Sequence, residues 1–167
     1  MFLYISALIL VCMLMPFLLT TNCFSVFVLF LLTVAMSGIA GVLTATRAQE
    51  MVLLAAGTTT VVVFVMTVMA CICVDFTPFT YIILVITMIV VVFGFFSIAL
   101  LPYIPMIKLI YSVVAALLMC VYIIIDTQMI IGGKSHELDT HMYIFGSIML
   151  YLDIVLLFFY ILDILDS

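Results

Sequence analysis

The chain has 167 residues, of which 71% are hydrophobic and 7% charged, and its net charge is −5. A soluble domain normally carries about a quarter charged residues, so this composition excludes a water-soluble globular protein. The three basic residues also exclude a nucleic-acid-binding surface, because phosphate binding needs a patch of cations.

Six apolar runs follow one another along the chain, and each approaches the roughly 20 residues that a helix needs to cross a bilayer. They cover residues 2–19, 24–43, 51–74, 79–101, 109–131 and 142–165. In lipid an open strand would leave its amides unpaired, so helix is expected even for the runs rich in Val and Ile. The sequence predicts an all-α membrane protein of about six transmembrane helices, in a single domain that spans residues 1–167.

The breaks between the runs contain the few residues that bear on orientation. Gly132 and Gly133 are expected to close the fifth helix, because glycine accepts the left-handed backbone that caps a helix. With alternating crossings, Arg47 and Lys108 lie on one side of the membrane and Lys134 on the other. Positive-inside counting favours the first side as cytosolic, by a narrow margin of two charges to one.

Two acids lie inside apolar runs, Asp126 in the fifth and Asp153 in the sixth. A charged aspartate at bilayer depth costs roughly 2.5 to 3.5 kcal/mol on insertion scales. Such a residue is therefore first considered functional. The alternative is a neutral aspartic acid that joins two helices by a hydrogen bond.

Spacing alone leaves open whether the two acids meet. Counted from the ends of their helices, Asp126 lies about 8 Å deep and Asp153 about 17 Å deep, and this offset shrinks if the turn between the helices is centred later. If they pair, two carboxyls in a low-dielectric site share one proton, which makes a latch sensitive to pH. When ionised, the pair is an oxygen-rich site for Ca²⁺.

The other polar side chains are expected to have structural roles. We expect Tyr122 to pack, Gln128 to be a satisfied group near a helix end, Asp163 and Asp166 to reach the membrane interface, and Arg47 to pair with Glu50 on a loop. The five cysteines are expected to be ordinary buried or interfacial thiols.

The C-terminal part of the chain contains a characteristic series of short segments: Asp126-Thr127-Gln128, Gly132-Gly133-Lys134, Tyr143 and Leu150-Tyr151-Leu152-Asp153-Ile154. This series resembles the signature of the lifeguard branch of the Bax inhibitor family. Val74-Asp75-Phe76-Thr77 and Ala56-Gly57-Thr58-Thr59 are similar to two further family segments. The resemblance extends from about residue 24 to residue 165.

The resemblance implies a seven-helix fold in which the other helices wrap a central last helix. It implies that Asp126 and Asp153 match the family's paired aspartates, which are associated with pH-sensitive Ca²⁺ leak. Animal members limit cell death and lower stored Ca²⁺ in the endoplasmic reticulum or Golgi. The expected partners are the lipid bilayer, Ca²⁺, protons and other membrane proteins of cell-death regulation, and no cofactor is expected. The resemblance places the turn over residues 132–141 in the cytosol.

The chain also departs from the family pattern. It is expected to begin at the equivalent of the family's second helix. A basic residue that latches the aspartates in some members has no counterpart before Arg47.

The paired acids suit three functions. The first is a proton-gated Ca²⁺ leak protein or a regulator derived from one, and the second is a non-conducting membrane interaction protein. The third is an intramembrane aspartyl protease. It is disfavoured because the catalytic aspartates of those proteases lie in Tyr-Asp and Gly-x-Gly-Asp motifs, whereas here Ile125 and Leu152 precede the two acids. We therefore expect that the protein is not an enzyme.

Overall fold

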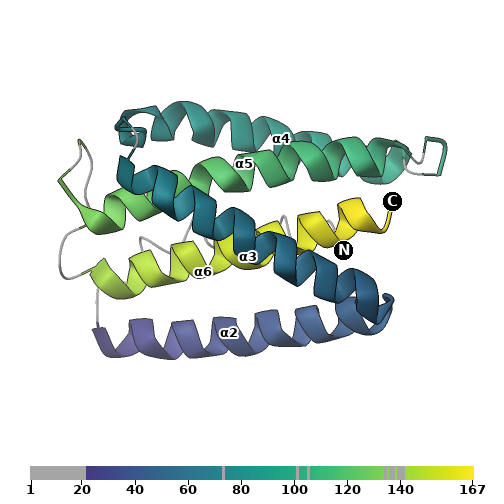
Figure 1. Cartoon of the computed structure of the whole chain (residues 1–167), viewed down its shortest axis with the longest axis horizontal. Coiled ribbons are helices and arrows are strands. Elements are labelled where there is room, and N and C mark those ends of the chain that lie inside the picture. The colour runs from purple at the N-terminus through teal and green to yellow at the C-terminus, as the bar shows by residue number, and fades with distance from the viewer. Residues whose placement is uncertain are drawn as a thin grey trace.

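The computed structural model describes residues 22–72, 74–100, 102–104, 106–133, 135, 138 and 142–167. Regular structure in these residues is entirely helical. The long helices are α2 (Asn22–Ala45), α3 (Gln49–Ile72), α4 (Thr80–Leu100), α5 (Met106–Ile131) and α6 (Tyr143–Leu165), and a short 3₁₀ helix, η2 (Thr77–Phe79), precedes α4. In Figure 1, α3 crosses obliquely over α5 and α6, while α4 and α2 lie at opposite edges of the bundle.

Four helical segments are long and apolar enough to cross a membrane: Gln49–Ile72, Thr77–Ser97, Met106–Ile131 and Ile144–Leu165. A fifth apolar stretch, Leu29–Ala45 in α2, is shorter. The prediction of an all-helical integral membrane protein is therefore confirmed. The count of six spans is not, and the helix expected over residues 2–19 lies outside the described residues.

Helices α5 and α6 form the core of the described bundle. Helix α6 packs against α5, α3 and α2, and α5 also packs against α3 and α4. The share of the apolar span that is buried inside the protein is 56% for α5 and 44% for α6. It is only 11% for α3 and 17% for α4. The resemblance implied one central helix, whereas in the described residues an antiparallel pair shares that position.

The outer helices keep apolar side chains on their exposed faces. Leu53 and Phe64 of α3 are 74% and 70% exposed, and Tyr81 of α4 is 72% exposed. Apolar surface of this extent is unfavourable in water and suits contact with lipid tails. The exposed side chains therefore place the bundle in a bilayer.

Helix α5 ends where the sequence predicts. Gly132 and Gly133 have φ angles of 76° and 73°, the left-handed conformation that glycine adopts without steric cost. The Gly132 N–H donates a hydrogen bond to the Gln128 carbonyl at 3.1 Å. The Leu138 N–H then donates to the Met129 carbonyl at 3.1 Å, so the connection folds back along the last turn of α5.

This folded-back connection sets the register between α5 and α6. A Cβ on Gly146 would lie 3.0 Å from Cγ1 of Ile130 and 3.1 Å from Cδ1 of Leu138, so Gly146 is level with Ile130. Counted from these two residues, Asp126 and Asp153 differ in depth by three positions, about 4.5 Å along the helix axis. The larger offset predicted from the helix ends was wrong, because the two ends are not level.

Candidate functional site

Asp126 of α5 and Asp153 of α6 are brought together in the core of the bundle. Asp126 is 3% exposed and Asp153 is 9% exposed, and the two carboxyls are within hydrogen-bonding contact. Side chains of a helix tilt toward its N-terminus. Because α5 and α6 are antiparallel, the two side chains tilt toward each other and close the remaining offset.

A hydrogen bond between two carboxyls requires a proton on one of them, since an ionised carboxylate is an acceptor only. Oδ2 of Asp153 is buried and has no hydrogen-bond partner among the described residues. Buried polar atoms are nearly always satisfied in native structures. This oxygen therefore needs a proton shared with Asp126, a water molecule or a cation as its partner.

Tyr122 lies one turn before Asp126 on α5 and adds a third polar group. Its hydroxyl is 2.7 Å from the Thr87 hydroxyl of α4, and the Asp126 and Asp153 carboxyls act electrostatically on that hydroxyl. The sequence suggested a packing role for Tyr122. The four-residue spacing between Tyr122 and Asp126 indicates that both lie on one face of α5. The contact with Thr87 could not be predicted in this way, because it depends on how α4 packs against α5.

Gln128 anchors the end of α3 to α5. Its Nε2 donates to the carbonyls of Ala70 and Val74, each at 3.2 Å, and its Oε1 accepts the Phe76 N–H at 2.9 Å. This agrees with the expected satisfied polar group near a helix end. The anchor lies two residues from Asp126 along α5 and holds the loop that follows α3 against α5.

Asp75 joins the two connections at this end of the bundle. Its Oδ1 accepts the N–H and hydroxyl of Thr77 at 3.0 and 2.7 Å, and its Oδ2 accepts the N–H and hydroxyl of Ser135 at 2.8 and 2.5 Å. The bonds from Ser135, and then those from Thr77, hold the pKa of Asp75 well below its usual range. Sequence reasoning missed this junction. The Asp-x-Thr spacing signals its local half, but nothing in the sequence points to Ser135.

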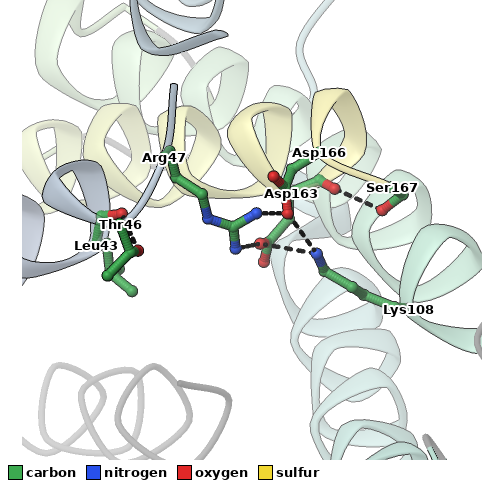
Figure 2. Close-up of polar contacts among 7 residues, drawn as sticks. All are labelled: Leu43, Thr46, Arg47, Lys108, Asp163, Asp166 and Ser167. Carbon is green, nitrogen blue, oxygen red and sulfur yellow. Dashed lines mark hydrogen bonds and ion pairs between the residues drawn. The ribbon is translucent and has the colours of Figure 1, made fainter. Parts of the chain in front are cut away.

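Four charged side chains gather at the opposite end of α6, and Figure 2 shows them. We call Arg47, Lys108, Asp163 and Asp166 the charge cluster. The Asp163 carboxyl lies 3.2 Å from Arg47 and 3.6 Å from Lys108, and the Asp166 carboxyl lies 3.3 Å from Lys108 and also pairs with Arg47.

The charge cluster adds to one expectation and corrects another. Asp163 lies near the end of α6, and its expected place at the membrane interface stays a prediction; within the protein it is 2% exposed, with two cations beside it. Arg47 was expected to pair with Glu50, but it reaches Asp163 and Asp166 instead. The end of α6 packs beside the turn between α2 and α3, and this proximity gives Arg47 closer partners.

The described residues contain no group of three or more His, Cys, Asp or Glu side chains that could hold a metal ion. Ca²⁺ usually takes six to eight oxygen ligands. The Asp126–Asp153 pair supplies only part of such a shell.

The fold and the site together define a polytopic helical membrane protein with a pair of carboxyls buried between its two core helices. The family described as "Inhibitor of apoptosis-promoting Bax1" matches residues 1–167 of the chain. The chain belongs to this Bax inhibitor family, which confirms the resemblance seen in the sequence. Protein lifeguard 3 of Mus musculus is 29% identical over 59 residues, which cover 35% of this chain and 19% of the mouse protein.

Proposed function

We propose that the protein is a pH-sensitive Ca²⁺ leak channel, or a regulator of Ca²⁺ homeostasis and cell death, in an intracellular membrane such as that of the endoplasmic reticulum or Golgi. The observation that carries this proposal is the contact between Asp126 and Asp153, buried on the two core helices. Membership of the Bax inhibitor family supports a role in cell-death regulation.

The pair responds to protons through the charge that it carries. With one proton, the hydrogen bond between the carboxyls holds α5 against α6. Without it, two negative charges face each other in a low-dielectric site, and their repulsion must be relieved by separation of the helices or by a cation. A Ca²⁺ ion, as the transported species, neutralises both carboxylates. Proton loss thus favours both the open helix pair and cation entry.

A second candidate is a non-conducting protein that binds other membrane proteins of cell-death regulation. The observation in its favour is that the described residues provide two carboxyls and not a complete Ca²⁺ shell. In this case the same hydrogen bond joins α5 and α6 permanently, and the bundle acts through its surface.

Ca²⁺ flux into dye-loaded liposomes separates these functions. The purified protein is reconstituted and flux is measured from about pH 6 to about pH 8, with Asp126→Asn and Asp153→Asn beside it. We expect a pH-dependent flux that both substitutions alter, because either one removes an ionisable partner. Glu50→Gln, at an exposed acid of α3, is the matched control and should leave the flux unchanged. Folded protein that gives no flux above empty liposomes would contradict the channel and leave the interaction protein.

A further inference from the structure

We call the contact between α5 and α6 the seam, and these two helices contain several buried polar atoms without a partner. In the described part of the chain, four buried side-chain atoms have no hydrogen-bond partner: Oγ of Ser112, Oγ1 of Thr127, Oδ2 of Asp153 and Oδ2 of Asp163. All four residues belong to α5 or α6. Such atoms in a native protein call for water, a proton or an ion. The seam is therefore polar at both ends of the core.

The two ends of the seam are far apart. Lys108 and Asp126 are 18 positions apart on α5, about 27 Å along the helix axis. Met119 and Leu156 are buried between these ends in an apolar cluster. At the Asp163 end, the rings of Tyr111 and Tyr160 meet edge to face with centroids 6.1 Å apart, and Ser112 lies one turn from Lys108. Ser112 and Asp163 thus place two buried polar atoms without a partner at the end of the core that adjoins the charge cluster.

The charge cluster lies at this same end of the core. Its members come from three segments: the turn between α2 and α3, the first turn of α5 and the end of α6. The Asp163 side chain is 3% exposed, against 17% for Arg47 and 21% for Lys108. A buried carboxylate without its cations is strongly destabilised, so the closed end depends on both basic residues.

We propose that the charge cluster is an ionic lock that closes this end of the α5–α6 seam, and that water and cations reach the buried Ser112 hydroxyl only when Arg47 and Lys108 release Asp163. If the protein conducts Ca²⁺, the lock regulates that conduction, and this part of the proposal rests on the proposed function. The lock itself is inferred from the ion pairs and does not depend on conduction.

Thiol labelling in lipid vesicles tests the lock without requiring conduction. Ser112→Cys is introduced after the five native cysteines have been replaced by alanine, and a membrane-impermeant reagent is applied from the side of the charge cluster. We expect slow labelling with the lock intact. Arg47→Gln combined with Lys108→Gln should raise the labelling rate at least tenfold. Arg47→Lys keeps the charge and should stay slow, and Glu50→Gln is the matched control.

Equal labelling rates in the locked and unlocked proteins, with both showing a cooperative thermal transition, would overturn the proposal. Asp163→Asn is the second variant if the double substitution does not fold. It removes the shared anion and should also accelerate labelling, and an unchanged rate counts equally against the lock. If the Ca²⁺ flux depends on Asp126 but the labelling rate never changes, the lock is rejected and the leak channel is not. Faster labelling in a protein without flux supports the lock and rejects the leak channel.

Discussion

At the scale of single residues, Asp75 shows how a carboxylate acts when it is fully partnered. Each of its oxygens accepts two hydrogen bonds, two from Thr77 and two from Ser135. These bonds favour the ionised form and lower the pKa of Asp75. Asp75 therefore stays ionised throughout the physiological pH range and cannot be the proton sensor of the protein.

The lowered pKa of Asp75 gives a pH-dependent contribution to stability with a definite sign. Because the folded-state pKa lies below that of the unfolded chain, the contribution is complete above the unfolded value of about 3.9 and falls as pH decreases below it. We expect Asp75→Asn to lower the thermal unfolding midpoint by a constant amount between about pH 5 and pH 8, and by less below about pH 4.

Ser135→Ala tests the same contact from the donor side. It removes one of the four bonds and should give a smaller loss over the same pH range. A midpoint difference for Asp75→Asn that varies between about pH 6 and pH 8 would contradict the assignment, because it would require Asp75 to titrate there.

At the scale of helices, α4 meets α5 through a glycine. A Cβ on Gly94 would lie 2.8 Å from the hydroxyl oxygen of Tyr111 and 3.0 Å from two of its ring carbons. Tyr111 is 5% exposed, and the rings of Phe93 and Tyr160 lie 6.5 and 6.1 Å from it, centroid to centroid. Tyr111 has little room to move, so the absence of a side chain at Gly94 allows the two helices to approach.

We predict that Gly94→Ala lowers the free energy of unfolding by about 1–3 kcal/mol, the usual cost of overpacking a filled interior. The measurement is the thermal or denaturant midpoint in detergent or nanodiscs. Gly57→Ala in α3 is the matched control, since nothing lies within 4 Å of a Cβ at that position. Adding Tyr111→Phe to Gly94→Ala removes the closest atom and should recover part of the loss. If Gly94→Ala behaves like Gly57→Ala, the close packing is not significant.

At the scale of the whole molecule, the antiparallel helices separate two polar ends. Asp75, Gln128 and Ser135 lie at the end near the paired acids, and the charge cluster lies at the other. Arg47 and Lys108 share that second end, as alternating crossings predict, and there they meet the acids of α6. The orientation of the protein in the membrane therefore decides whether the charge cluster faces the cytosol or the lumen.

Following the family resemblance, we predict that the end with Asp75 faces the cytosol and the charge cluster faces the lumen. Val74 and Tyr103 lie beyond opposite ends of α4, and both are 82% exposed. In sealed microsomes of a variant without native cysteines, an impermeant thiol reagent should label Val74→Cys at once. Tyr103→Cys should react only after permeabilisation. The reverse order would show that the positive-inside count is right and the family-based orientation wrong.

Much of the fold follows from local properties of the chain. Apolar runs of about 20 residues predict helices in lipid because each backbone amide must be satisfied within its own segment. The five runs within the described residues accordingly became α2 to α6, with boundaries that differ by a few residues. The Gly132-Gly133 stop depends only on the conformational freedom of glycine, and the structure shows it where expected.

The sequence by itself also determined that Asp126 and Asp153 are exceptional, since an acid in an apolar run is costly wherever the helix packs. Only the tertiary structure decided that they meet, because the level of two antiparallel helices depends on how their connection folds back. The burial of Asp163 and the partners of Arg47 likewise arise from segments more than 100 positions apart. Such contacts depend on which helix ends pack together, and the spacing of residues along one chain does not contain that information.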